Sequence, residues 1–376
     1  MGRQAEGCVA MSEFIRSIRA ILNRNKDQHS IPVMDGNLSP NDALDRCGEL
    51  SAFDAPPDDI AFDAAGVLHI SVGNQVLRWM PDADTWEEVA ALPGPVGGLA
   101  FHPDGSLFAC VSGEGLAHIT EQGTNWVRAA GGKPLGCLTS VTVAQNGTVY
   151  LTQGSCQTQT EDWVVDLMQK NSSGLLISYD PGTGDAQILL RNLAYPSGVA
   201  MTPDQQNLVY SESWAHTLTQ CDRSGSALKK VVRNFPGYPS RLAPDGPGGY
   251  WVCLFGARTH LVELVLDDTA FRTSMMAEID PAYWICPSLR ATGSYMEPLQ
   301  GGGIKKLGVV KAWAPPRSYG LVLRINHEGD IMESLHSRVG GTCHGVTSVQ
   351  PQADGLYVVS KGHQRLVRQQ RETADG

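Results

Sequence analysis

The strongest constraint on the fold is a pattern that recurs six times along the chain. In each copy an alternating apolar segment leads through a turn rich in Asp, Asn or Gly into a second alternating segment, as in a β-hairpin with one buried face. The six copies are DIAFDAAGVLHIS (59–71), GLAFHPDGSLFAC (98–110), SVTVAQNGTVYLT (140–152), GVAMTPDQQNLVYS (198–211), RLAPDGPGGYWVC (241–253) and VTSVQPQADGLYVVS (346–360). Several intervals between copies are about 40 residues, the length of one four-stranded propeller blade.

This spacing predicts an all-β fold, namely a single six-bladed β-propeller over residues 51–370. A sandwich of two β-sheets is the alternative, but it does not explain the regular spacing. Longer intervals after the third and fifth copies indicate insertions, and helical periodicity is expected in residues 160–170. Residues 260–266 (HLVELVL) are expected to form a further blade strand.

Two segments fall outside the blade pattern. Residues 1–50 are expected to form an N-terminal extension with a short amphipathic helix at 13–26, where apolar residues share one face. That helix is predicted to dock on the protein body, and a membrane-surface helix is the alternative. The segment 281–319 combines aromatic residues with a GGG motif, which is typical of a lid-like insertion or an oligomer contact.

The composition excludes several classes of protein. A chain of 376 residues with 42% hydrophobic and 18% charged residues is typical of a packed globular protein. Its net charge of −10 argues against nucleic-acid binding, and no apolar run approaches the roughly 18 residues of a membrane span. The nine cysteines contain no CxxC pair, which indicates free thiols rather than a zinc site. We therefore expect a cytoplasmic protein whose partner is a small-molecule substrate, without stable membrane insertion and with homo-oligomerisation left open.

The propeller prediction also places a candidate site. In this fold the first strand of every blade lines the central channel, so residues just before those strands gather at one mouth. The residues expected there are Asp58, Thr139, Ser197, Ser240 and the segment before Val346. They are far apart in the sequence, but we expect them to lie close together in the fold.

Four ordered segments carry a resemblance to a known superfamily. They are residues 174–222, 234–258, 318–335 and 345–360. Together they resemble the strictosidine synthase-like proteins, including the adipocyte plasma membrane-associated protein type, and more distantly the gluconolactonase/regucalcin and paraoxonase families. The resemblance implies a six-bladed propeller with its site at the channel mouth.

In the metal-dependent relatives, the resemblance implies a calcium-type ion held at the channel by Glu, Asn and Asp side chains. The matching positions here are Asp58, Thr139, Ser197, Ser240 and Arg241. Ca²⁺ prefers about six to eight oxygen ligands, so we expect a degraded calcium site and no cofactor, with Asp58 as a ligand if a metal is bound. Arg241 is predicted to pair with Asp58 and to donate to a substrate oxygen. A salt bridge at the rim is the alternative for this arginine.

Two titratable residues near the mouth are candidates for proton transfer. Glu212 follows the second strand of the fourth copy and is a candidate general base, whereas His344 precedes the last inner strand and is a candidate acid or base. Structural hydrogen bonding is the alternative for both residues. With Arg241 they form the predicted catalytic set. The predicted substrate-binding residues are Asp58, Thr139, Tyr195, Ser197, Trp214, Tyr238, Ser240 and Cys343.

The resemblance, together with the candidate residues at the channel mouth, favours an enzyme. The first hypothesis is a lactonase- or esterase-like hydrolase that acts on a small lactone or ester. A metal-independent lyase, isomerase or C–N/C–C condensing enzyme is the second hypothesis, and a non-catalytic small-molecule-binding propeller is the third. Strictosidine synthases use a glutamate in the last blade for proton transfer, but the matching segment here carries Ser348 and no acid. This difference argues against the same condensation chemistry.

Overall fold

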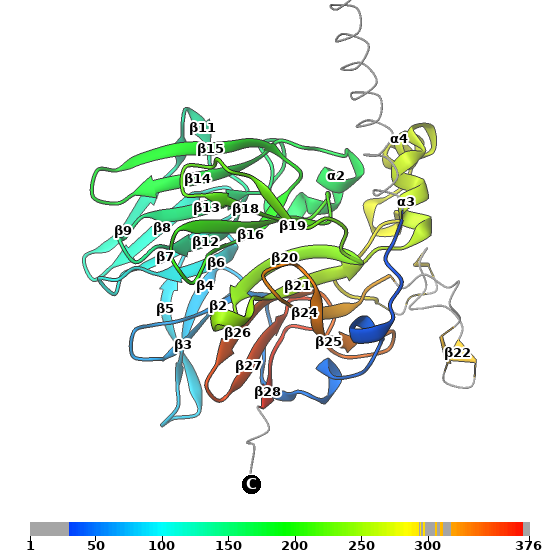
Figure 1. Cartoon of the computed structure of the whole chain (residues 1–376), viewed down its shortest axis with the longest axis horizontal. Coiled ribbons are helices and arrows are strands. Elements are labelled where there is room, and N and C mark those ends of the chain that lie inside the picture. The colour runs from blue at the N-terminus through cyan, green and yellow to red at the C-terminus, as the bar shows by residue number, and fades with distance from the viewer. Residues whose placement is uncertain are drawn as a thin grey trace, which may run out of the picture.

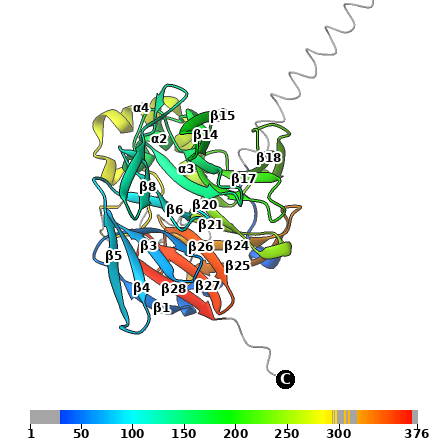
Figure 2. The same ribbon diagram turned by 90° about the vertical axis from the view of Figure 1, so that its left-hand side faces the viewer.

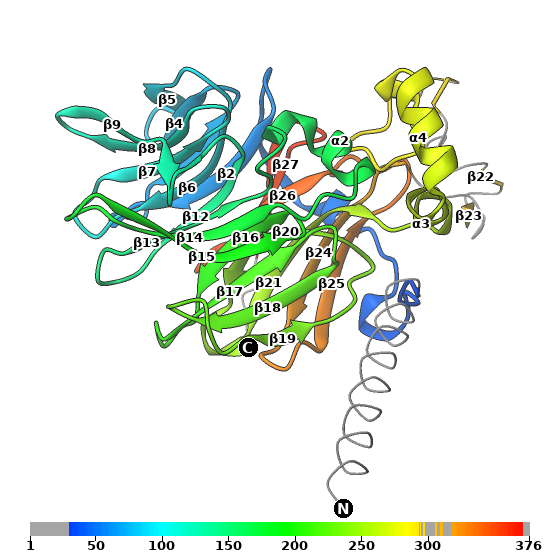
Figure 3. The same ribbon diagram turned by 90° about the horizontal axis from the view of Figure 1, so that it is seen from above.

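The computed structural model describes residues 30–292, 294, 296–297, 305–306, 309–310 and 317–370. The predicted helix at 13–26 and part of the 281–319 insertion lie outside these residues. Within them, six four-stranded antiparallel sheets surround a central axis (Figure 1). The turned views show the sheets arranged as a ring, with the helices gathered on one side (Figures 2 and 3). The prediction of an all-β, six-bladed propeller is confirmed.

Each of the first three blades follows the chain order of its strands. Blade 1 contains β2 (Pro57–Phe62), β3 (Leu68–Val72), β4 (Gln75–Met80) and β5 (Thr85–Ala91). Blade 2 contains β6 (Val96–Phe101), β7 (Leu107–Val111), β8 (Gly115–Thr120) and β9 (Gly123–Val127). Blade 3 contains β12 (Leu138–Val143), β13 (Val149–Gln153), β14 (Gly174–Asp180) and β15 (Asp185–Leu193). A small hairpin of β10 (Ala129–Ala130) and β11 (Lys133–Pro134) lies between blades 2 and 3 in the sequence.

The last three blades include the closure of the ring. Blade 4 contains β16 (Pro196–Met201), β17 (Asn207–Glu212), β18 (Thr217–Asp222) and β19 (Lys229–Val232). Blade 5 contains β20 (Gly237–Pro244), β21 (Tyr250–Ala257), β24 (Gly320–Ile325) and β25 (Ile331–Ser337). Blade 6 contains β26 (Val346–Gln352), β27 (Gly355–Ser360), β28 (Arg365–Gln370) and, as its outer strand, β1 (Gly48–Ala52). Because β1 pairs with β28, the two ends of the propeller are joined by hydrogen bonds within one blade.

The inner strands of all six blades share an irregular start. The pairing of β2, β6, β12, β16, β20 and β26 with the next strand shifts in register near the beginning of each strand. A β-bulge of this kind leaves one or two residues without a partner and turns their side chains. The unpaired residues include Asp58, Gly97, Thr139, Ser197, Arg241 and Thr347. The bulges therefore give each blade a residue at the channel mouth.

Apolar side chains between neighbouring blades form the core. Between blades 4 and 5, for example, Val209, Leu218 and Leu254 belong to one buried cluster. The inner strands approach so closely that Gly198 of β16 has no room for a side chain, since a Cβ there would lie 2.5 Å from the carbonyl oxygen of Ser240. This close approach brings the bulges of adjacent blades within hydrogen-bonding distance of one another.

Two insertions carry the helices. Between β13 and β14 lie the 3₁₀ helix η3 (Thr160–Asp162) and α2 (Trp163–Met168), in agreement with the expected helical periodicity. Between β21 and β24 lie α3 (His260–Asp267), α4 (Thr269–Glu278), η5 (Pro281–Tyr283), β22 (Lys305–Lys306) and β23 (Val309–Val310). Three further 3₁₀ helices are η1 (Gly36–Leu38), η2 (Leu44–Arg46) and η4 (Gly246–Gly248).

The prediction of a blade strand at 260–266 is wrong, because these residues form α3. The hydroxyl of Thr259 accepts a hydrogen bond from the backbone N–H of Val262 and caps the helix. Val262 and Val265 are buried, whereas Leu261 and Leu264 are exposed, so the apolar residues follow a helical period. The short run HLVELVL fits the period of a strand and that of a helix, and the N-cap residue Thr259 favours the helix.

Candidate functional site

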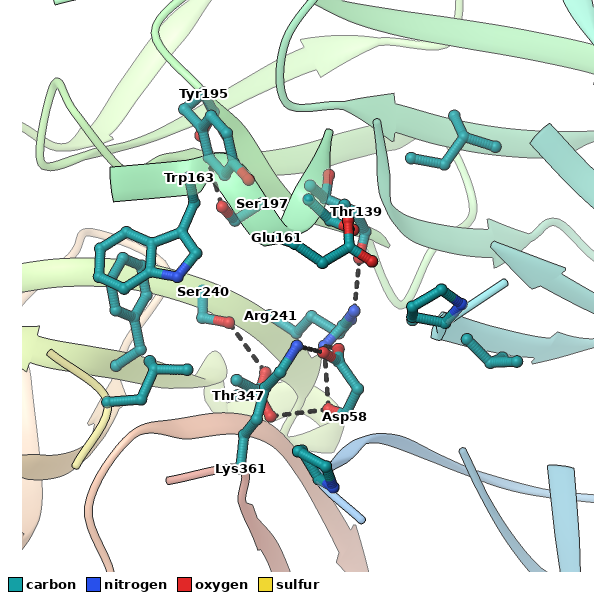
Figure 4. Close-up of a pocket in the computed structure, with 18 of the residues that line it drawn as sticks. Asp58, Thr139, Glu161, Trp163, Tyr195, Ser197, Ser240, Arg241, Thr347 and Lys361 are labelled. Carbon is teal, nitrogen blue, oxygen red and sulfur yellow. Dashed lines mark hydrogen bonds and ion pairs between the residues drawn. The ribbon is translucent and has the colours of Figure 1, made fainter. Parts of the chain in front are cut away.

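A pocket opens at the channel mouth, and all six inner strands contribute to it. Its volume is about 380 Å³. The bulge residues that line it are Asp58, Gly97, Thr139, Ser197, Ser240, Arg241 and Thr347. Around them the lining includes Trp163, Tyr195, Phe255 and Leu289 as apolar walls, and Glu161 and Lys361 as charged groups (Figure 4).

Charged side chains on the pocket floor form a compact ion cluster. The Nη1 group of Arg241 lies 2.5 Å from Asp58 Oδ1 and donates to the Asp58 carbonyl oxygen at 3.0 Å. Its Nη2 group donates to the Thr139 carbonyl oxygen at 2.5 Å, and its Nε lies 3.4 Å from Asp59 Oδ2. The ammonium of Lys361 pairs with the second oxygen of Asp58. The predicted Arg241–Asp58 pair is confirmed, and the guanidinium lies in the channel rather than at the rim.

The two adjacent carboxyl groups of the cluster differ in their electrostatics. Burial disfavours the charge of Asp58, but Arg241 and Lys361 outweigh this and hold the pKa of Asp58 below its ordinary value. Burial raises the pKa of Asp59, because the attraction of Arg241 offsets only part of the lost hydration. Although burial disfavours its charge too, the neighbouring carboxylates raise the pKa of Arg241. Asp58 is therefore the firmly ionised member of the cluster.

The hydroxyl groups of the bulge residues link neighbouring blades. Thr139 Oγ1 donates to the Pro196 carbonyl oxygen at 2.7 Å, which joins blade 3 to blade 4. Ser240 Oγ donates to the Thr347 carbonyl oxygen at 2.9 Å, and Thr347 Oγ1 donates to the Asp58 carbonyl oxygen at 2.7 Å. These two bonds join blades 5, 6 and 1. The side chains of these bulge residues therefore hold neighbouring blades together.

Ser197 takes part in a similar link. Its Oγ lies 2.6 Å from Ser213 Oγ, and Ser213 donates to the Pro239 carbonyl oxygen at 2.6 Å. No histidine or carboxylate is hydrogen-bonded to Ser197 among the described residues. The contacts of Ser197 are those of a structural hydroxyl rather than those of an activated nucleophile.

The residues on the floor do not fit a calcium ion. Both carboxylate oxygens of Asp58 face cations, Arg241 and Lys361, and the carbonyl oxygens of Asp58 and Thr139 already accept from the guanidinium. A divalent cation would meet two positive charges where it needs several free oxygens. Nowhere in the described part of the chain do three or more His, Cys, Asp or Glu side chains form a group that could hold a metal.

Aromatic rings form one wall of the pocket. Tyr195 stacks on Trp214 with ring centroids 4.4 Å apart, and Trp163 packs against Phe255 at 5.3 Å. Tyr238 stacks on Phe255 at 5.6 Å and is fully buried. Tyr195, Trp163 and Phe255 line the pocket, whereas Trp214 and Tyr238 do not. This corrects the expectation that the last two bind substrate, since they form a second layer that supports the wall.

Glu212 lies outside the pocket lining. Its carboxylate pairs with Lys230 at 2.8 Å and accepts hydrogen bonds from the Ala194 backbone N–H and the Thr217 hydroxyl. The expectation that Glu212 faces the substrate is corrected, because its carboxylate turns toward blade 4 and the segment before it. Its contacts match the structural alternative.

His344 and Cys343 also lie outside the pocket lining. One ring nitrogen of His344, Nδ1, lies 2.8 Å from Ser318 Oγ, and the other, Nε2, lies 2.9 Å from the Arg338 carbonyl oxygen. Because burial disfavours the charged ring, the pKa of His344 is lowered. Cys343 belongs to a buried apolar cluster with Leu44, and burial raises the pKa of its thiol to about 12. Both residues are therefore structural, which corrects their predicted roles at the site.

Sequence reasoning missed two charged residues of the pocket, Glu161 and Lys361. Glu161 belongs to η3 and accepts hydrogen bonds from the hydroxyls of Ser112 at 2.6 Å and Thr160 at 3.2 Å. It is exposed, and no ion pair involves it within the described residues. Lys361 directly follows β27, and its position one residue beyond the second strand of a blade was the available signal.

Part of this chain is similar in sequence to known proteins. The family model for strictosidine synthase matches residues 139–221. Strictosidine synthase-like 6 of Arabidopsis thaliana is 30% identical over 217 residues, which cover 55% of this chain and 58% of the relative. The adipocyte plasma membrane-associated protein of Salmo salar is 26% identical over 221 residues, which cover 53% of each chain. The matches thus span only about half the length of these curated relatives.

Among solved structures, a gluconolactonase of Xanthomonas campestris has a TM-score of 0.55 and 15% identity, and the match covers 85% of this chain and 89% of that one. Similarity at this level concerns the fold alone. In the described residues, none of the helices has the length and apolar character needed to cross a membrane. Part of this chain is therefore similar in sequence to strictosidine synthase-like proteins, and the chain shares its propeller fold with this gluconolactonase.

Proposed function

We propose that the protein is an enzyme that hydrolyses a small lactone or ester in the channel-mouth pocket without a calcium ion. The observation that carries this proposal is the position of Lys361. Its side chain is 33% exposed, lines the pocket and is anchored by the buried carboxylate of Asp58. An ammonium fixed beneath apolar walls is suited to bind the oxygen of a polarised carbonyl group.

Lys361 would act on the carbonyl oxygen and Arg241 would support it. A lysine ammonium has three N–H donors, and Asp58 takes one of them. Among the described residues no other acceptor bonds to this ammonium, so the remaining donors can bind a ligand in the pocket. Arg241 directs its donors mainly at Asp58 and Thr139, so its role is to hold Asp58 in place and add positive charge. Negative charge that develops on the substrate oxygen during hydrolysis would be stabilised by this arrangement.

Glu161 is the proposed general base. In Figure 4 Glu161 lies above Arg241, and the side chain of Lys361 reaches up from below it. Glu161 would take a proton from a water molecule as the water oxygen bonds to the carbonyl carbon. When the bond to the leaving oxygen breaks, the same proton passes to that oxygen, and the products are a carboxylic acid and an alcohol. For a lactone, both groups remain in one molecule.

The test is a pair of neighbouring substitutions, Glu161→Gln and Asp162→Asn. Both residues are exposed on η3, but only Glu161 lines the pocket. We expect Glu161→Gln to lower kcat by about 10²-fold or more on a panel of small lactones and aryl esters, because a positioned base contributes about that much. Asp162→Asn should keep wild-type activity. If both variants hydrolyse the best substrate at the wild-type rate, Glu161 is not the base.

A metal-independent lyase, isomerase or condensing enzyme is the second candidate. The match to the strictosidine synthase model favours it, since residues 139–221 include Thr139, Glu161, Tyr195 and Ser197 of the pocket. Turnover in ¹⁸O-labelled water separates the two proposals, because only hydrolysis places a water oxygen in the product. A ligand that binds tightly and returns unchanged would instead support a non-catalytic propeller.

The proposed location is the cytoplasm. The eight cysteines of the described residues are free thiols, which is typical of a reducing compartment. Four curated relatives are named as plasma membrane-associated proteins, which indicates the alternative location. Fractionation of cells that express the full chain distinguishes these locations, and recovery of the protein in the membrane fraction would contradict the proposal.

A further inference from the structure

The insertion in blade 5 exposes an unusual number of apolar side chains. We call residues 260–283, which comprise α3, α4 and η5, the helical cap. Of the eleven large apolar side chains that are exposed in the described residues, the cap carries five: Leu261, Leu264, Phe271, Ile279 and Tyr283. Leu264 is 64% exposed and Phe271 is 47% exposed. Apolar side chains that gather on one surface element are typical of a docking site.

The cap is also acidic. It contains five carboxylates and one arginine, which give 1 − 5 = −4. Glu263 and Asp267 pair with Arg258 and Lys170. The other three carboxylates, Asp268, Glu278 and Asp280, are exposed and have no ion-pair partner within the described residues. A ligand for this surface should therefore be apolar on one face and positively charged on the other.

The described chain begins beside the cap. The Ser30 carbonyl oxygen accepts a hydrogen bond from Asn234 Nδ2 at 2.7 Å, and Asn234 Oδ1 accepts one from Arg258 Nη1 at 2.5 Å. Arg258 Nε in turn donates to Glu263 Oε1 of α3 at 2.9 Å. In Figure 1 the first described residues run up to α3. The four residues from Ser30 back to Lys26 can span about 14 Å at most, so the preceding segment stays within reach of the cap.

That preceding segment has the complementary chemistry. Residues 13–26 contain four basic side chains and Glu13, which give 4 − 1 = +3. Phe14, Ile18 and Leu22 are spaced four residues apart and would share one face of a helix. A helix of this length would be about 21 Å long. We propose that residues 13–26 dock on the helical cap, with their apolar face against Leu264 and Phe271 and their basic residues toward the exposed carboxylates.

Docking would also affect the candidate site. The chain enters the insertion after Phe255 and leaves η5 shortly before Leu289, and both residues line the pocket. A docked N-terminal segment would hold the two ends of the cap together and so stabilise this wall. The proposal does not depend on the reaction that the pocket catalyses.

The experiment is amide hydrogen exchange on the full chain, read out on residues 13–26. A free helix of about 14 residues is marginal in water, so slow exchange of this segment requires a docking partner. We expect the wild-type segment to exchange at least about tenfold more slowly than a peptide of the same sequence. Leu264→Glu should abolish this protection, because a carboxylate on the cap replaces the apolar contact. Ile18→Glu should also abolish the protection, because it places a carboxylate on the apolar face of the N-terminal segment.

Leu228→Glu is the matched control, since Leu228 is 59% exposed but lies outside the cap. It should leave the protection unchanged. Equal protection in the Leu264 and Leu228 variants would overturn the proposal. Protection that rises with protein concentration would assign the surface to a second copy of the chain instead. Protection that requires vesicles of phosphatidylcholine and phosphatidylserine would assign the segment to a membrane surface.

Discussion

Two lysine–carboxylate pairs of this propeller look alike and occupy different places. Lys361 pairs with Asp58, and Lys230 pairs with Glu212. The two lysine side chains are 33% and 34% exposed, and the carboxylates are 12% and 10% exposed. Only the first pair lines the pocket. The residue types and the exposure of an ion pair therefore do not decide whether it belongs to the site. The position of the pair in its blade decides this.

The two pairs differ in location because Glu212 and Lys361 are offset by one residue along the second strands of their blades. Glu212 pairs with the start of the inner strand β16, and Ser360 holds the same position opposite β26. Lys361 is one residue further along, and its counterpart in blade 4 is Ser213, which bonds to the pocket residue Ser197. Because successive side chains of a strand point to opposite faces, a shift of one residue moves a side chain out of the channel.

The largest expected effect is on stability and concerns the arginine shared by both acids of the floor. Arg241→Met would leave the buried carboxyl groups of Asp58 and Asp59 without their main partner. Breaking a buried ion pair by removing one member costs about 3–5 kcal/mol. We expect the free energy of unfolding, measured with urea, to fall by about that amount.

The control for this prediction is Arg46→Met. Arg46 pairs with Asp42 at 3.1 Å, the two side chains are 69% and 51% exposed, and neither residue lines the channel-mouth pocket. Ion pairs exposed to this degree contribute about 0–1 kcal/mol. Equal losses in the two variants would mean that the floor cluster does not stabilise the ring.

The second prediction tests the two lysine pairs directly. Lys361→Met should lower kcat/KM for the best lactone or ester by about 10²-fold, because removal of one donor to a developing oxyanion has that effect. Lys230→Met should leave kcat/KM close to the wild-type value, because Glu212 and Lys230 lie outside the pocket lining. Steady-state kinetics on both variants provides the measurement.

Protein stability must be followed in the same samples. Asp58 keeps Arg241 as a partner when Lys361 is replaced, so most of the protein should remain folded. A loss of activity in both lysine variants would contradict the difference between the pairs. An unchanged rate in Lys361→Met would remove this lysine from the proposed mechanism.

The third prediction concerns the pH dependence of stability. Since the pKa of Asp58 is lowered in the fold, this residue stabilises the protein above about pH 3.9, the ordinary pKa of an aspartate in an unfolded chain. That contribution disappears as the pH falls through the lowered pKa of the folded state. Asp59 has a raised pKa and acts in the opposite sense, because protonation at falling pH relieves its buried charge.

Asp58→Asn should therefore be much less stable than the wild type near neutral pH, and the difference should narrow as the pH falls below about 3.9. Urea unfolding at a series of pH values measures this. Asp42→Asn is the control, because Asp42 and Arg46 form an ion pair whose side chains are 51% and 69% exposed. Parallel curves for the wild type and Asp58→Asn would contradict the assigned charge of Asp58.

Much of the architecture was predictable, because it depends on local patterns. Alternation and turn residues identified the six hairpins, and the bulge positions Asp58, Thr139, Ser197 and Ser240 follow from the starts of the inner strands. The helix α3 was missed because its short apolar run fits a strand equally well. Periodicity alone therefore identified the blades but did not identify the cap.

The rest of the site depends on contacts that sequence patterns do not contain. Lys361 and Glu161 enter the pocket from a loop after β27 and from an insertion in blade 3, and their direction depends on register and packing. His344 is close to the pocket residue Thr347 in sequence, yet its ring is held by Ser318 and Arg338. Nearness to a strand start was thus a poor guide for His344, because both of its ring nitrogens have partners outside the pocket lining.

The smallest expected effect is that of metal removal. This prediction tests whether a calcium ion can replace the cations that pair with Asp58. Calcium could bind the floor only if Asp58 released Arg241 or Lys361, and each release would leave a cation beside the metal. We therefore expect hydrolysis and thermal stability to be unchanged after treatment with a calcium chelator, and calorimetry to detect no stoichiometric calcium binding. Lys361→Met should also bind no calcium, because Arg241 still occupies one oxygen of Asp58. A tightly bound calcium ion whose removal abolishes hydrolysis would show that Asp58 exchanges its partners, and the fixed ammonium would then no longer explain the activity.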